Sequence, residues 1–110
     1  MIFYTTENVK APKLEKRKTN VWIKTVADKY DKKIGEIAYI FCDDAKILEV
    51  NKTYLQHDYF TDIITFDYCE GAVLNGDIFI SLDTVRTNAQ EFGVTFENEL
   101  HRILIHGILH

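Results

Sequence analysis

The sequence predicts an α+β domain in which a small mixed sheet of about four strands packs with helices. Three observations support this prediction. The 110 residues suit one domain, 46% of them are apolar and only one is proline, so a core can form. Strand-like apolar runs and segments of helical periodicity follow one another in the order β-α-β-α-β-β-α-α. Two strand runs, 63–69 and 77–82, are close enough in sequence to pair as a hairpin.

The first part of the chain contains two predicted strands and the helix between them. Residues 2–6, with the sequence IFYTT, have the side chains of a short strand. Pro12 suits the first turn of a helix, and apolar residues then recur at helical spacing to about residue 30. Gly35 interrupts this pattern. The apolar run at 36–42 is nearly continuous, which predicts a central strand.

A second helix and the hairpin come next. Asp43 and Asp44 are good N-caps for a helix over 44–55. The polar and aromatic loop over 56–62 then leads into the first hairpin strand, and the turn GAVLNG connects the two strands.

Two helices complete the predicted order. Asp83 or Thr84 would cap a helix that ends at about Phe92, where Gly93 is a natural residue to follow the last turn. Thr95 opens the last predicted helix, whose first turn is acidic, as the helix dipole favours.

Basic side chains are concentrated in one segment. The net charge of the chain is −4, but residues 10–33 hold nine of the thirteen Lys and Arg and carry +6, which leaves −10 elsewhere. Lys13, Arg17 and Lys24 are four and seven residues apart and form a stripe on the predicted helix. Such a stripe could contact a polyanion, for example a nucleic-acid backbone, or it could be an ordinary solvated helix face.

Composition argues against several classes of protein. No apolar run approaches the ~20 residues that cross a membrane, and the start of the chain lacks the pattern of a secretory signal. Cys42 and Cys69 form no CxxC pair, which argues against a disulfide framework and a four-cysteine metal site. The sequence has no Gly-rich phosphate loop and no nucleophile elbow. We therefore expect a cytoplasmic domain with no membrane partner.

The sequence HGILH places His106 and His110 one helical turn apart. Two neutral imidazoles at this spacing can share a Zn²⁺ ion, although zinc needs at least a third ligand and none is apparent in this helix. The pair could also be two histidines that happen to be spaced so. Gly107 stands where an HExxH metalloprotease has its glutamate. Because glycine costs about 1 kcal/mol relative to alanine in a helix, we expect a backbone or a ligand to approach it closely.

Other polar residues have simpler explanations. His101 lies about 140° around the helix from His106, so we expect it to be packed or to act as a cap. His57 falls in the predicted loop and is expected to face solvent. Asp62 precedes a strand, where it could be a turn residue.

Three blocks occur together and in order. The first, over 51–66, contains NKTY and ends in TDIITF; the second is GDIFIS at 76–81; the third is HGILH at 106–110. Together they resemble the YbeY family of bacterial endoribonucleases and rRNA maturation factors. The third block is similar to the opening of the family's H-G-x-L-H-L-x-G-Y-D-H motif.

The resemblance implies a mixed sheet with a zinc-binding last helix, on which His106 and His110 would be the first two ligands of one Zn²⁺. Asp62 would line the cleft. The third ligand would follow His110, so we expect 1–110 to be a single domain that lacks its C-terminal end and is inactive in this form. Leu55 stands where the family pattern has arginine, so this chain lacks that phosphate-neutralising group.

The resemblance also implies a cytoplasmic enzyme that cleaves single-stranded RNA. It would act on rRNA and assist assembly or quality control of the small ribosomal subunit, in contact with that subunit or its proteins. Two alternatives stay open at this point. One is a metal-dependent hydrolase of peptides or other small substrates, and the other is a non-catalytic ribosome assembly factor. The oligomeric state is not indicated by the sequence.

Overall fold

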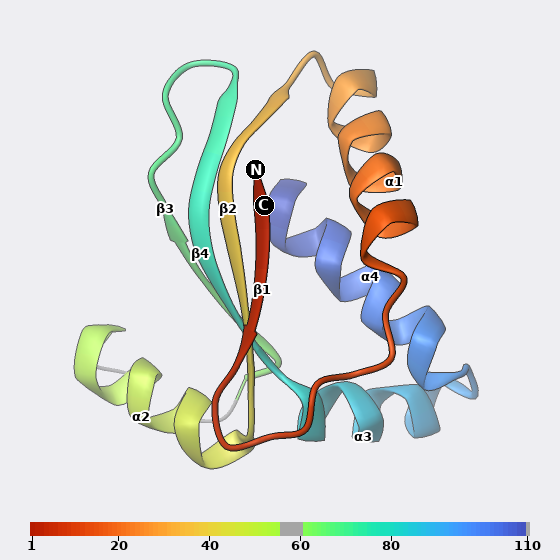
Figure 1. Cartoon of the computed structure of the whole chain (residues 1–110). Coiled ribbons are helices and arrows are strands. Elements are labelled where there is room, and N and C mark those ends of the chain that lie inside the picture. Colours follow the sequence, from red (N-terminus) through yellow and green to blue (C-terminus); the bar gives the residue numbers. More distant parts are fainter. Residues whose placement is uncertain (56–60, 110) are drawn as a thin grey trace.

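One mixed sheet forms the centre of the molecule (Figure 1). The structure is a computed structural model that describes residues 1–55 and 61–109, and its strands lie in the order β1-β2-β4-β3. Their bounds are Ile2–Thr6 (β1), Lys33–Cys42 (β2), Ile63–Asp67 (β3) and Val73–Ser81 (β4). β1, β2 and β4 are parallel, whereas β3 is antiparallel to β4. The predicted hairpin and the predicted central strand are both confirmed.

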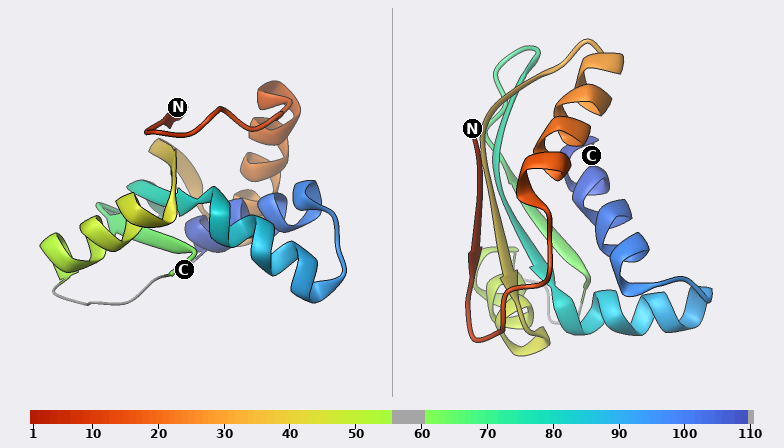
Figure 2. Two further views of the ribbon diagram at one scale, coloured as in Figure 1. Left: turned by 90° about the horizontal axis from the view of Figure 1, so that it is seen from below. Right: turned by 45° about the vertical axis from the view of Figure 1, so that its right-hand side comes forward.

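Helices cover the sheet unequally. Their bounds are Lys16–Lys29 (α1), Asp44–Leu55 (α2), Leu82–Phe92 (α3) and Phe96–Leu109 (α4). α1 and α4 lie side by side against one face, and α3 leads into α4 at the end of the sheet (Figures 1 and 2). α2 packs on β3 and β4 from the other face. The predicted order of elements and the α+β class are therefore confirmed.

The alternation of side chains along the strands creates two cores. The larger core joins β2 and β4 to the helices α1, α3 and α4; its fully buried members include Ile23, Tyr39, Ile80, Val85, Ile103 and Leu104. The hydroxyl of Tyr39 donates a hydrogen bond to the carbonyl of Leu104 at 2.7 Å, so its burial leaves no polar atom without a partner. The smaller core lies under α2 and contains Cys42, Ile47, Val50 and Ile64.

The start of α1 differs from the prediction. The helix begins at Lys16 with Glu15 as its N-cap, four residues later than Pro12. Leu14 packs against the larger core from the irregular segment that links β1 to α1. This long-range contact holds the segment outside the helix, which the local signal of Pro12 could not indicate.

The hairpin and the helix caps also differ in detail. β4 begins at Val73, so part of the predicted turn belongs to the strand, and Cys69 lies exposed beyond the end of β3. Asp43 caps α2, because its carboxylate accepts a hydrogen bond from the Lys46 amide at 2.8 Å. Ser81, and not Asp83 or Thr84, is the N-cap of α3.

Candidate functional site

One flank of α4 carries three polar side chains in succession. Glu99, Arg102 and His106 lie within about 60° of one another around the helix axis, because residues three, four and seven apart share a helix face. Arg102 and His106 are exposed, whereas only 2% of Glu99 is exposed. A carboxylate, a guanidinium and an imidazole therefore follow one another along this flank.

Glu99 and Arg102 form a two-point ion pair. Nε of Arg102 donates to one carboxylate oxygen at 2.9 Å and Nη2 donates to the other at 2.6 Å. These hydrogen bonds raise the pKa of Arg102 above its ordinary value, and the charge of Asp62 adds to the effect. The guanidinium stays charged, and the buried carboxylate has a partner for each oxygen.

Asp62 lies where β3 begins, close to this flank. Its carbonyl accepts a hydrogen bond from the amide of Ser81 at 3.0 Å, which extends the pairing of β3 with β4. The Asp62 side chain is half-buried, and its negative charge contributes to the raised pKa of Arg102. The structure thus brings Asp62, which the sequence pattern singled out, to the same edge of the molecule as Arg102.

Gly107 explains how α4 can approach the sheet closely. A Cβ atom at this position would lie 2.8 Å from Cδ1 of Ile63 and 3.0 Å from Cγ2 of Ile78. Both distances are shorter than ordinary van der Waals contact. The expected close approach is confirmed, but side chains of β3 and β4 make it rather than a backbone or a ligand. This turn of α4 therefore packs against Ile63, the first residue of β3.

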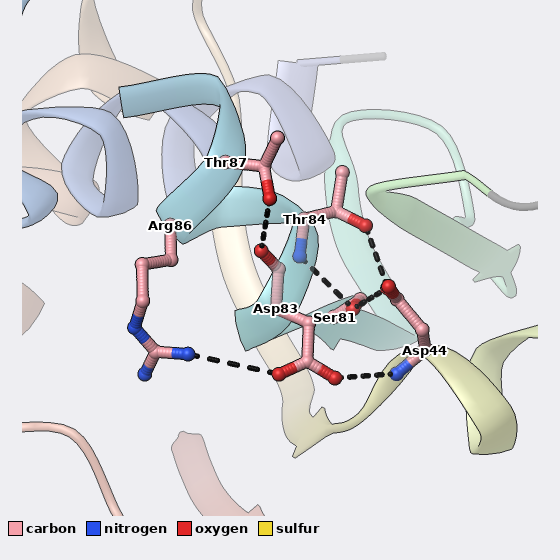
Figure 3. Close-up of polar contacts among 6 residues, drawn as sticks. All are labelled: Asp44, Ser81, Asp83, Thr84, Arg86 and Thr87. Atoms are coloured by element: carbon pink, nitrogen blue, oxygen red, sulfur yellow. Dashed lines mark hydrogen bonds and ion pairs between the residues drawn. The ribbon is translucent and has the colours of Figure 1, made fainter. Parts of the chain in front are cut away.

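A polar cluster joins the N-termini of α2 and α3 (Figure 3). One carboxylate oxygen of Asp44 accepts hydrogen bonds from the hydroxyls of Ser81 and Thr84, the latter at 2.7 Å. The Asp44 amide donates to the Asp83 carboxylate at 3.0 Å. Arg86 pairs with the second oxygen of Asp83 at 3.6 Å. Because Ser81 also pairs with Asp62 through its backbone amide, this cluster anchors the start of β3.

His101 faces α1. His101 makes an edge-to-face contact with Trp22 of α1, with ring centroids 5.5 Å apart, so the expectation that it is packed is confirmed. Because His101 and His106 are about 140° apart on α4, the His106 flank points away from α1. His110 and His57 lie outside the described residues.

The basic stripe is only partly assembled. Arg17 and Lys24 are exposed on α1, seven residues apart, as expected. Lys13 is exposed as well, but it precedes Lys16, the first residue of α1, so the prediction that it lies on that helix is wrong. α1 contacts α4 through Trp22 and His101, and His101 is about 140° around α4 from His106.

A cavity of about 420 Å³ lies at the C-terminal end of α4. Ile37, Leu74, Ile78 and Ile108 give it an apolar floor, while the hairpin contributes polar atoms at its rim. None of the site residues predicted from the sequence is among the described residues that line it.

Residues 3–110 match the family model described as Endoribonuclease YbeY. The chain belongs to this family. An Endoribonuclease YbeY from Bacteroides thetaiotaomicron is 66% identical over 109 residues, covering 99% of the chain and 80% of the relative. Another YbeY, from Phocaeicola vulgatus, is 66% identical over 110 residues, covering all of the chain and 80% of the relative.

The YbeY fold is supported by a solved structure as well. The solution structure of TM1509 from Thermotoga maritima matches with a TM-score of 0.71 and 31% identity. The match covers 100% of the chain and 71% of that structure. The resemblance inferred from the three sequence blocks is therefore confirmed.

The nitrogen donor of His106 suits zinc, which binds neutral imidazole readily. The described residues contain no group of three or more His, Cys, Asp or Glu side chains placed to hold a metal ion. His106 thus supplies one imidazole of the predicted pair, and the other, His110, lies outside the described part of the chain. No helix in residues 1–55 and 61–109 is long and apolar enough to span a membrane.

Sequence reasoning missed Glu99 and Arg102. The sequence does contain a signal for the pair, because opposite charges three residues apart meet on a helix. It contains no signal for the burial of Glu99, since an acidic residue in the first turn of a helix is ordinarily exposed.

Proposed function

We propose that the chain is a zinc-dependent endoribonuclease that cleaves single-stranded RNA during rRNA maturation. The family match over residues 3–110, with relatives named Endoribonuclease YbeY at 66% identity, supports this proposal most strongly. The exposed His106 beside Arg102 agrees with it, because an imidazole and a cation are suited to a phosphodiester substrate.

His106 and His110 are the proposed zinc ligands. When bound, zinc would supply a Lewis acid and a water of lowered pKa. Gly107 lets α4 pack closely on Ile63 and Ile78, and Asp62, which precedes β3, is the proposed residue of the cleft wall.

The proposed partners are rRNA and the small ribosomal subunit or its proteins, in the cytoplasm. Arg17 and Lys24, together with Lys13 in the segment before α1, offer exposed positive charge for the RNA backbone. This contact would be independent of base sequence and would weaken as salt is added.

A cleavage assay with two histidine variants tests this function. Zinc-loaded full-length protein is incubated with single-stranded RNA, and His106→Ala is compared with its control on the same helix, His101→Ala. We expect His106→Ala to abolish cleavage, while His101→Ala retains it, because His101 packs on Trp22 away from the proposed ligand. Cleavage that survives in His106→Ala would contradict the proposed metal role.

The same preparations separate the alternative functions. Cleavage of a peptide substrate without cleavage of RNA would indicate the hydrolase of small substrates. Position 107 argues against the HExxH form of that chemistry, since Ile63 and Ile78 leave no space for a glutamate side chain. Binding of ribosomal subunits with RNA left intact would indicate a non-catalytic assembly factor.

A further inference from the structure

The ion pair of Glu99 and Arg102 differs from the other ion pairs within helices. Side-chain exposure is 2% for Glu99 and 52% for Arg102. In the pairs Lys18–Glu15 and Arg86–Asp83, by contrast, both side chains are at least 47% exposed. In the pair Lys46–Glu49 the two side chains are 25% and 68% exposed. Among these described pairs of residues three apart, Glu99 is the one fully buried partner.

A buried carboxylate of this kind is costly for stability. Removing a charge from water is costly, and an ion pair recovers that cost only with good geometry. An exposed pair would stabilise α4 slightly without this cost. The buried pair does add one thing that an exposed pair lacks: two hydrogen bonds to a fixed carboxylate hold the guanidinium in one orientation.

The geometry leaves part of the guanidinium available. Glu99 occupies the edge of Arg102 that carries Nε and Nη2, so the end that carries Nη1 lies outside this pair. Half of the side chain is in solvent, one helical turn before His106. Planar guanidinium donors are well suited to the oxygens of a phosphate.

We propose that Arg102 contacts a phosphate of the bound RNA strand and that Glu99 is the positioning residue that orients it. This inference rests on the proposed function and adds to it a specific anion contact on the His106 flank. The stripe of Arg17 and Lys24 lies on α1, which packs on the His101 side of α4, about 100° around the helix from Arg102. Arg102 would hold the strand next to the imidazole.

Binding of a short fluorescent 2′-O-methyl oligonucleotide, measured by anisotropy at several salt concentrations, tests the proposal without requiring cleavage. Arg102→Gln alone would leave the buried Glu99 charge without its partner and could unfold the chain. The double variant Glu99→Gln/Arg102→Gln removes both charges and avoids that problem. Arg86→Gln is the matched control, because Arg86 also pairs with an acidic residue three positions earlier on a helix.

We expect the double variant to bind roughly tenfold more weakly, which corresponds to about 1.4 kcal/mol. The slope of log affinity against log salt should fall by about 0.7, the value for one phosphate contact on a single strand. Arg86→Gln should change neither quantity. Glu99→Gln alone should keep the salt slope but weaken binding, since the cation remains and its orientation is lost.

Unchanged affinity and salt slope in the folded double variant would overturn the proposal. An equal effect of Arg86→Gln would also overturn it, because any surface cation would then suffice. A separate assay of RNA cleavage by the zinc-loaded wild-type protein reports on the proposed function. Absence of cleavage there, with Arg102-dependent binding intact, would reject the nuclease activity and leave the phosphate contact established.

Discussion

Gly107→Ala measures how closely α4 is packed on the sheet. Two opposing effects determine its result. Alanine gains about 1 kcal/mol over glycine inside a helix. The new methyl group would lie 2.8 Å from Cδ1 of Ile63 and 3.0 Å from Cγ2 of Ile78, so neighbours must move. Overpacking of this kind costs about 2 kcal/mol, so we expect a net loss of about 1 kcal/mol in the free energy of unfolding.

The Ile63 contact can be isolated by a second substitution. Ile63→Val removes the Cδ1 atom that the new methyl group would meet, so Gly107→Ala should be nearly neutral in that background. Ile78→Val is the matched control, because it also removes one methyl group, but that atom is 3.3 Å from the Cβ position. Its coupling to Gly107→Ala should be smaller.

Urea denaturation followed by circular dichroism provides the free energies for this double-mutant cycle. A gain of about 1 kcal/mol in Gly107→Ala would refute the reasoning, because helix propensity alone would then describe the site. Equal coupling to Ile63→Val and Ile78→Val would show that the clash is not located at the Ile63 methyl group.

Two further predictions concern the polar cluster and alkaline pH. Asp44→Ala should lower the free energy of unfolding by about 2 kcal/mol in the same urea assay, because the fully buried Ser81 hydroxyl loses its acceptor. Asp44→Asn keeps an acceptor oxygen and should cost less than half as much. Burial raises the pKa of Cys42 from 9.0 to about 12, and that of Tyr4 from 10.0 to about 12. Because the unfolded chain ionises first, these groups stabilise the fold fully below pH 9, and this stabilisation is lost as pH rises from 9 to 12. Urea titrations at increasing pH should therefore show that the free energy of unfolding declines less steeply in Cys42→Ala than in the wild type. Identical pH profiles of the two proteins would contradict this explanation.

Local sequence signals predicted several elements well. The bounds of α2 agree with the predicted 44–55, and Gly93 follows α3 with a φ of 65°, as a left-handed residue should. The spacing of His106 and His110, together with the two blocks before it, was sufficient to identify the family. These signals succeed because caps, periodicity and motif spacing act within a few residues of the chain.

Other features depend on contacts between distant residues. The strand order β1-β2-β4-β3 was not predicted, and Lys13 lies outside α1 because Leu14 packs on the larger core. In α4, both Glu99 and Glu97 were expected in an ordinary acidic first turn, yet only Glu99 is buried.

The sequence by itself therefore determined the order of the elements, the family and the His106 spacing. The tertiary structure alone decided what the His106 flank of α4 meets: Glu99 is buried, the charge of Asp62 at the start of β3 reaches Arg102, and α1 packs on the His101 side of α4. The reason is that helical periodicity defines the faces of α4, but only packing against β3, β4 and α1 decides what each face meets.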